Sequence, residues 1–230
     1  MKVAIIGNGG SVHRKENGPW IDSCDIVVRM KQYVTDGFEK YTGTKIDIYS
    51  SKWFSWFDNF APYKPKNMSH VSSAKEFWFM FPDPNVSIYP KDTYSERYIQ
   101  YSLKNDTPEK TGTIREHQNN IELFGLNKNK IRYMDIGLLS NLAKNLQLSE
   151  NIHYDKKGKP ILIEPSVGIR TIEMALDRFT DYDIFITGFD CFLESSWYWD
   201  NEHVINNDHN YINEKIYLTR LIKSKKVIEI

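Results

Sequence analysis

Two polar side chains near the carboxyl end of the chain have the types and spacing of a proton-transfer site. His209 and Glu214 form the pattern HxxxxE at the entry of a predicted helix. An imidazole titrates near neutral pH, and an acid that steers its ring makes it a suitable general base. We therefore interpret His209 as a candidate base, with a simple helix cap as the alternative interpretation.

The connection that precedes this helix carries further candidates. Asp190, Tyr198 and His203 follow the predicted strand Asp183–Thr187, and α/β sheets bind ligands beyond the carboxyl ends of their strands. A surface position is the alternative for His203. Zinc is disfavoured for the two histidines, because no cysteine or third histidine falls at the spacing of a metal site.

A possible metal motif, Asp181-Tyr182-Asp183, matches the DxD string of many nucleotide-diphosphate transferases. It precedes the strand Asp183–Thr187, so it belongs at the sheet edge opposite the expected ligand. We interpret it as a turn and expect no metal.

A glycine-rich turn, GNGGSV at Gly7–Val12, follows the first predicted strand. Its glycines allow the backbone to approach a ligand closely and leave N–H groups facing it. The dinucleotide fingerprint expects a third glycine where Val12 stands, and an acid at the end of the second strand, where the sequence has Arg29 and Lys31. An NADP-dependent oxidoreductase and a tight turn without a ligand both stay open. Asn8, an amide between two glycines, favours a phosphate or sugar contact.

A second turn of this kind is ILIEPSVG, at Ile161–Gly168, which precedes a helical pattern. Ser166 and Gly168 would stand at the helix N-terminus, where backbone N–H groups and the helix dipole favour an anion. Ser166 as a plain N-cap is the alternative. Two such turns at one sheet edge predict a phosphate site.

The elements that must position these residues follow from hydrophobic patterning. Short apolar runs predict buried strands at Lys2–Ile6, Asp25–Arg29, Lys45–Tyr49, Glu76–Met80, Lys130–Met134, Asp183–Thr187 and Lys226–Ile230. Helical patterns cover Ser95–Leu103, Ile114–Phe124, Leu138–Leu148, Gly168–Arg178 and Ile212–Lys223. This alternation predicts an α/β fold, a Rossmann-like doubly wound, mostly parallel sheet in one domain over residues 1–230. Irregular lid or acceptor loops are expected around residues 53–108 and 193–208.

Composition narrows the class of protein. The 230 residues carry a formal net charge of zero, which argues against capture by nucleic acid or anionic membrane. Two cysteines, Cys24 and Cys191, do not make a disulfide framework. A strand that begins at residue 2 leaves no room for a signal peptide, and no stretch has transmembrane length. We expect a soluble, cytoplasmic protein.

Together these motifs resemble the sialyltransferases of glycosyltransferase family 29 and their bacterial relatives in family 42. The resemblance covers Val3-Ala4-Ile5-Ile6-Gly7-Asn8-Gly9, Gly18, Ile21-Asp22, Asp25, Val27-Val28-Arg29-Met30, Pro165-Ser166, Gly168, Ala175-Leu176, Gly188-Phe189-Asp190, His209 and Glu214. Order and spacing agree over nearly the whole chain, whereas residues 53–159 match little.

The resemblance implies transfer of sialic acid from CMP-sialic acid to an acceptor glycan, with His209 as base. By the family pattern, Asn8 contacts the donor phosphate or sugar, Ser166 with Gly168 holds the CMP portion, and His203 binds the phosphate. Tyr198 would stabilise the leaving phosphate. The other residues assigned to the donor site are Gly7, Gly9, Lys31, Gln32 and Gly188. Direct attack would invert the anomeric centre, and a single phosphate implies no metal cofactor.

The chain also departs from the pattern. Lys31 stands where the families have Asn, although Gln32 matches a Gln of family 42, and the family 42 tyrosine aligns with Trp197, so that Tyr198 is a substitute. The paired cysteines of animal enzymes are absent at their places, which fits a microbial or viral protein.

Three other functions stay open besides the oxidoreductase already named. These are a transferase of the same fold that uses CMP-Kdo, one that uses a UDP-sugar, and a non-catalytic nucleotide-binding protein. The aromatic stretch at Trp53–Phe60 could stack on an acceptor sugar, rest on a membrane that carries a glycolipid, or close over the core.

Overall fold

The computed structural model describes residues 1–52, 71, 73–81, 83, 121, 126–148, 153–154, 160–161, 163–191, 197–199 and 209–230. His203, the helix predicted at Ser95–Leu103 and the stretch Trp53–Phe60 lie outside the described residues. So do most of the helix predicted at Ile114–Phe124 and most of the two predicted loop regions.

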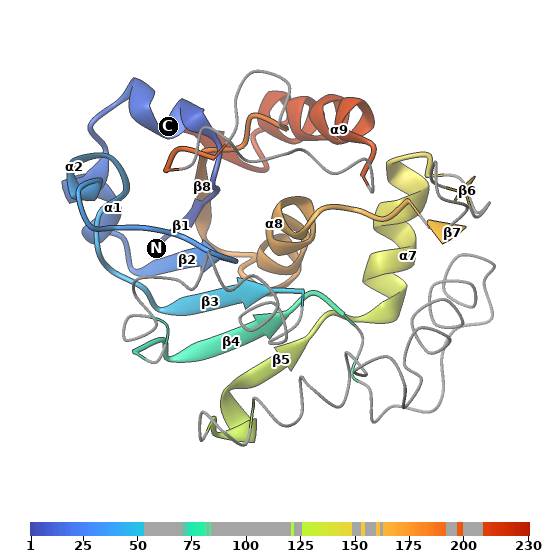
Figure 1. The fold of residues 1–230 in the computed structure, drawn as a ribbon, viewed down its shortest axis with the longest axis horizontal. Coiled ribbons are helices and arrows are strands. Elements are labelled where there is room, and N and C mark those ends of the chain that lie inside the picture. Colours follow the sequence, from blue (N-terminus) through green and yellow to red (C-terminus); the bar gives the residue numbers. More distant parts are fainter. Residues whose placement is uncertain are drawn as a thin grey trace.

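A seven-stranded sheet forms the centre of the fold (Figure 1). Its strands, in the spatial order β5-β4-β3-β2-β1-β8-β9, are Ile131–Tyr133, Glu76–Phe79, Ile48–Ser51, Ile26–Met30, Lys2–Ile6, Asp183–Thr187 and Ile228–Glu229. Every neighbouring pair is parallel. A separate antiparallel pair joins β6 (His153–Tyr154) to β7 (Pro160–Ile161). The predicted α/β fold is confirmed.

The third predicted strand begins later than expected. The sequence predicts Lys45–Tyr49, whereas β3 begins at Ile48. The amides of Thr44 and Lys45 donate to the carboxylate of Asp22 at 2.8 Å instead of joining a neighbouring strand. A side-chain acceptor distant in sequence has taken the backbone N–H of Lys45, which the apolar pattern assigned to the sheet.

Three longer helices begin at polar caps. They are α7 (Ile136–Asn145), α8 (Val167–Arg178) and α9 (Tyr211–Lys223), and their N-cap side chains are Asp135, Ser166 and Asn210. Each cap accepts a hydrogen bond from a backbone N–H in the first turn. The structure also contains the short helices η1 (Gly10–Arg14), α1 (Gly18–Asp22), α2 (Glu39–Thr42) and η3 (Lys128–Lys130), which are too short to show a helical period.

Alternating side chains of β1 pack against helices on both faces of the sheet. Val3 and Ile5 belong to the large core cluster that includes apolar residues of α7, α8 and α9. Ala4 and Ile6 face the opposite way and pack with Ile21 of α1. The sheet is therefore covered on both faces, as a doubly wound fold requires. None of the helices in the described ranges is both long enough and apolar enough to cross a bilayer.

The direction of winding reverses between β1 and β8, so a ligand crevice belongs at their carboxyl ends. There the Gly7 amide donates to Thr187 O, and the Gly9 amide donates to Gly188 O, both at 2.8 Å. A Cβ on Gly7 would lie 2.2 Å from Gly188 O. Gly188 adopts a φ of 74°, which favours glycine. These glycines allow two backbone turns to touch.

Candidate functional site

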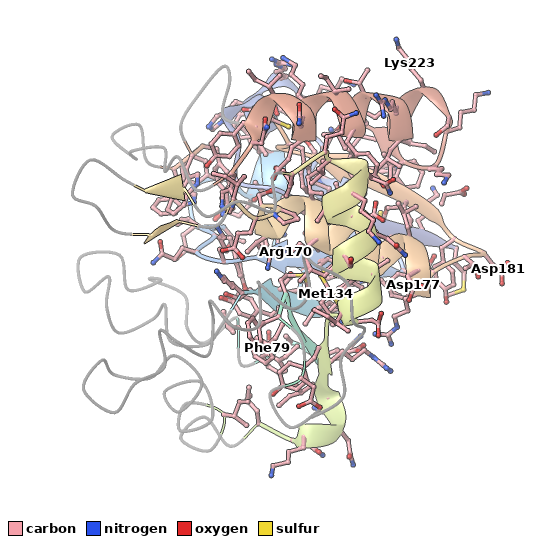
Figure 2. The ribbon with its side chains drawn as sticks, turned by 90° about the vertical axis from the view of Figure 1, so that its right-hand side faces the viewer. Phe79, Met134, Arg170, Asp177, Asp181 and Lys223 are labelled. Atoms are coloured by element: carbon pink, nitrogen blue, oxygen red, sulfur yellow. The ribbon has the colours of Figure 1, made fainter. Side chains whose placement is uncertain are left out.

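The candidate site lies at the edge of the sheet where the strands end. In Figure 2, Arg170 of α8 lies further toward this edge than Asp177 and Asp181, which lie on the opposite side with Lys223 at the end of α9. Because β8 begins at Asp183, the Asp181-Tyr182-Asp183 string is at the amino edge of the sheet, as its interpretation as a turn requires. Among the residues that the structure describes, no group of three or more histidine, cysteine or acidic side chains is placed to hold a metal.

His209 lies just before α9, with one ring nitrogen held by the main chain. Its Nδ1 is 2.7 Å from the carbonyl oxygen of Glu164. A carbonyl can only accept, so Nδ1 carries the proton and Nε2 keeps its lone pair. Burial, together with the charge of Lys31, lowers the pKa of His209 to about 4, although Glu164 opposes this shift. The imidazole is therefore neutral near pH 7, in the tautomer that a base acting through Nε2 needs.

Glu214 contacts Ser166, which corrects the expectation that its carboxylate steers the imidazole directly. The Ser166 amide donates to Oε1 and the Ser166 hydroxyl to Oε2 of Glu214, each at 2.6 Å. Burial raises the pKa of Glu214 to about 6, and the bonds from Ser166 limit the rise. Glu214 is thus a buried anchor that joins α9 to the start of α8, and any catalytic role for it remains a prediction.

The HxxxxE spacing has a structural explanation in the segment Glu164–Ser166. His209 binds the carbonyl of Glu164, and Glu214 binds the amide and hydroxyl of Ser166, two residues later. Pro165 lies between the two attachment points and restricts the backbone. Two contacts, one from just before α9 and one from its first turn, thus hold one short segment, and the base is oriented through that segment.

Asn8 supports the turn that presents Lys31. Its Nδ2 donates to Met30 O at 3.3 Å and to Gln32 O at 2.9 Å, the carbonyls on either side of Lys31. Lys31 has a φ of 50°, a left-handed conformation that costs about 1–3 kcal/mol for a residue with a side chain. Burial and the nearby Lys52 lower the pKa of Lys31 to about 8. The predicted donor-site residues Asn8, Lys31 and Gln32 are thus brought together.

Two buried polar atoms in this turn lack a hydrogen-bond partner among the described residues. They are Oδ1 of Asn8 and Nε2 of Gln32, and both side chains are 8% exposed. Buried polar groups in native proteins are almost always paired, so such atoms are suited to receive a ligand. An acceptor and a donor are therefore available beyond the carboxyl ends of β1 and β2.

The glycine turns do not present their amides as expected. The N–H groups of Gly7 and Gly9 are bonded to the turn after β8, and the N–H and hydroxyl of Ser166 are bonded to Glu214. The expectation that these groups face a ligand is therefore wrong for the Gly7 and Gly9 amides and for both donors of Ser166. Gly168 has another steric role, because a Cβ there would lie 3.1 Å from the Phe189 ring. Donor contacts by these residues and by Gly188 remain predictions.

Tyr198 lies at the site with its hydroxyl already bonded. The hydroxyl donates to Val34 O at 2.5 Å and accepts from the Val34 amide at 3.1 Å. Burial raises the pKa of Tyr198 to about 12. Its single proton is directed to the main chain, so this arrangement does not support the predicted donation to a leaving phosphate.

Three charged side chains at the site were missed by sequence reasoning. Lys52 follows β3, Glu164 precedes α8 and Arg170 lies in its first turns, and Glu164 forms ion pairs with both cations. One sequence signal existed, the single charge of Glu164 within the apolar stretch ILIEPSVG. Lys52 is remote from Glu164 in sequence, and Arg170, six residues after Glu164, belongs to no motif.

His209 makes the folded protein sensitive to acid. Its pKa is about 4 in the fold, and about 6.5 in an unfolded chain, so the unfolded chain protonates first and stability falls as the pH drops through this interval. Between about pH 7.5 and about pH 5, we expect the wild type to lose about 2 kcal/mol more unfolding free energy than His209→Gln. Urea unfolding of both proteins measures the difference. Glu214, which acts in the opposite direction, is common to both, and equal losses would contradict a buried neutral imidazole.

The sequence of this chain is similar to that of a known family and of several known proteins. The sequence matches glycosyltransferase family 29 (sialyltransferase) over residues 1–226. Alpha-N-acetylgalactosaminide alpha-2,6-sialyltransferase 2 of Mus musculus is 26% identical over 89 residues, 39% of this chain. CMP-N-acetylneuraminate-beta-galactosamide-alpha-2,3-sialyltransferase 1 of Homo sapiens is 35% identical over 80 residues, 32% of this chain. In each case the chain spans about a quarter (24%) of the relative's length.

Solved structures show the same fold. A mammalian sialyltransferase aligns with the whole of this chain and 68% of its own, with a TM-score of 0.56 and 16% identity. A mammalian sialyltransferase in complex with Gal-beta-1-3GalNAc-ortho-nitrophenol aligns over the same shares, with a TM-score of 0.54 and 17% identity.

Proposed function

Because the chain belongs to glycosyltransferase family 29, the sialyltransferases, we propose that it transfers sialic acid from CMP-sialic acid to a hydroxyl of an acceptor glycan. The observation that carries this proposal is His209 at the ligand edge of the sheet, with Nδ1 bonded to Glu164 O and Nε2 left as the basic atom. The family match over residues 1–226 supplies the reaction class.

The proposed reaction needs one proton acceptor and one anion site. The acceptor hydroxyl oxygen attacks the anomeric carbon of the sialic acid and forms the new glycosidic bond. The bond from that carbon to the phosphate oxygen breaks, and CMP leaves with the electron pair. The hydroxyl proton moves to Nε2 of His209. Attack opposite the leaving group inverts the anomeric configuration.

Charge at the site favours an anionic donor. Among the residues that the structure describes, Lys31, Lys52 and Arg170 interact electrostatically with the carboxylates of Glu164 and Glu214. CMP-sialic acid carries a phosphate and a sugar carboxylate, and both are negative at neutral pH. We propose that these cations stabilise the phosphate as it gains charge during bond cleavage and that no metal is needed.

An anion near Lys31 would also strengthen the base. Burial and Lys31 hold the pKa of His209 to about 4 in the protein without ligand. A bound phosphate or carboxylate offsets the charge of Lys31, so the pKa of His209 rises toward neutrality when the donor is present. A base is most effective with a pKa near the working pH, so donor binding and proton transfer are coupled.

The proposal predicts transfer activity with defined stereochemistry. The protein, incubated with CMP-sialic acid and a panel of galactosides and N-acetylgalactosaminides, should release CMP and form a sialylated product. Proton NMR of the product should show the anomeric configuration opposite to that of the donor. Activity should persist when EDTA is added.

Neither hydrolysis nor transfer across the panel would count against the proposal. Thermal shifts with CMP, UDP and GDP then identify the nucleotide. Greater stabilisation by UDP would point to a transferase that uses a UDP-sugar, whereas CMP binding without turnover would point to a non-catalytic nucleotide-binding protein.

A further inference from the structure

A buried ion cluster includes the side chain of Glu164, the first residue of the segment that orients His209. We use the term Glu164 cluster for Lys52, Glu164 and Arg170. Lys52 Nζ pairs with Oε1 of Glu164, and Arg170 Nη2 pairs with Oε2 at 2.5 Å. Glu164 is 9% exposed and Arg170 is 1% exposed. The interactions of His209 described above use the main-chain carbonyl of Glu164 and leave the function of its side chain unexplained.

The cluster ties this segment to the ends of two strands of the sheet, β3 and β4. Lys52 follows the last residue of β3, and Arg170 Nη1 donates to Met80 O, just beyond β4, at 2.6 Å. The same peptide segment is held from α9 through His209 and Glu214. The carbonyl of Glu164 therefore has a position fixed from both sides.

We propose that Lys52 and Arg170, acting through Glu164, are positioning residues that fix the tautomer and orientation of the His209 imidazole. The role rests on the proposed function of His209 as the base. None of the three cluster residues needs to touch a reacting atom. Without the ion pairs, the Glu164 carbonyl is free to shift, and Nδ1 of His209 loses the acceptor that holds its proton.

The charged groups around His209 determine how each substitution in the Glu164 cluster should change its pKa. The groups that act on His209 are Lys31 after β2, Glu164 before α8 and Arg170 within α8. Burial would raise the pKa of the Glu164 carboxyl, but Lys52 and Arg170 outweigh this and hold it well below its ordinary range. The charge of Glu164 raises the pKa of His209, and Lys52 partly compensates that charge.

Two substitutions should therefore act on His209 in opposite directions. Lys52→Met leaves the Glu164 charge less compensated, so the pKa of His209 should rise. Glu164→Gln removes the negative charge, so the pKa should not rise above its wild-type value. Both variants weaken the hold on the carbonyl, so both should show a mixture of Nδ1–H and Nε2–H tautomers.

Nitrogen-15 NMR of the histidine rings, recorded without donor or acceptor, measures tautomer and pKa together. The His209 signal is assigned by its loss in His209→Gln. Lys75→Met is the matched control, because Lys75 forms a 2.7 Å ion pair with Asp47 but is 78% exposed and precedes β4 at the opposite sheet edge. It should leave the His209 signal unchanged.

The NMR results distinguish a positioning role of the Glu164 cluster from a general loosening of the site. Mixed tautomers with a pKa that rises only in Lys52→Met support it. An unchanged His209 signal in Lys52→Met overturns it, and so does an equal rise in both variants, which indicates general loosening. The side chain of Lys52 is 26% exposed, so its variant decides the question even where Glu164→Gln does not fold.

The rate of the proposed transfer reaction should also depend on Lys52. Lys52→Met should lower kcat about tenfold. A wild type without transferase activity would refute the proposed function, whereas the NMR result would still decide whether the cluster positions His209.

Discussion

His209→Gln should lower kcat for the proposed sialyl transfer by about 10²- to 10⁴-fold, the usual contribution of a general base. The glutamine amide can still donate to Glu164 O, which accepts from Nδ1 in the wild type, but it offers no basic nitrogen to the acceptor hydroxyl. CMP binding should change by less than about threefold, because the loss concerns proton transfer rather than donor contacts. Initial rates and calorimetric titration with CMP measure the two effects.

A control for this variant is available on the same helix. Lys223→Gln alters the far end of α9, which lies on the opposite side of the molecule in Figure 2. Its rate should match the wild type. A His209→Gln protein with wild-type kcat, or one that loses CMP binding and activity in equal measure, would show that His209 is not the base.

Gly7→Ala should destabilise the fold by about 3 kcal/mol or more, at the upper end of overpacking costs. The new Cβ would meet Gly188 O at 2.2 Å and Gly188 C at 2.8 Å, and both atoms belong to a backbone that is hydrogen-bonded to the same turn. No flexible side chain can move aside. Chemical denaturation should show a lower midpoint, with the turns after β1 and β8 forced apart.

Gly137→Ala tests whether the effect is specific. Gly137 lies in the first turn of α7, where an added Cβ meets only Oδ1 of the Asp135 side chain, at 3.0 Å. Alanine favours a helix more than glycine does, so the net change should stay within about 1 kcal/mol. If Gly7→Ala unfolds at the same denaturant concentration as Gly137→Ala, the turns after β1 and β8 do not need their close contact.

The fold was predictable because buried parallel strands produce short apolar runs that can be read locally. The ranges Lys2–Ile6 and Asp183–Thr187 agree with β1 and β8 residue for residue. The beginning of β3 was less predictable, because it depends on Asp22, more than twenty residues away. Side-chain acceptors that reach across the fold leave no periodic signal.

The site was predictable only in its outline. The sequence placed His209, Glu214 and Ser166 at one edge, but it assigned Glu214 to the imidazole and the Ser166 donors to a ligand. The structure bonds these two residues to each other. Such pairings depend on how α8 and α9 pack, which is a tertiary property. The ion pairs of Glu164 depend on the same packing and could not be read from spacing.

His209 and Glu214 both attach to one peptide segment, so the number of residues between them at the start of α9 is constrained. Inserting one residue between them would rotate the later contact by about 100° around the helix axis, so only one of the two attachments could survive. A graft that carries the start of α9 should therefore copy the five-residue step from His209 to Glu214 without change.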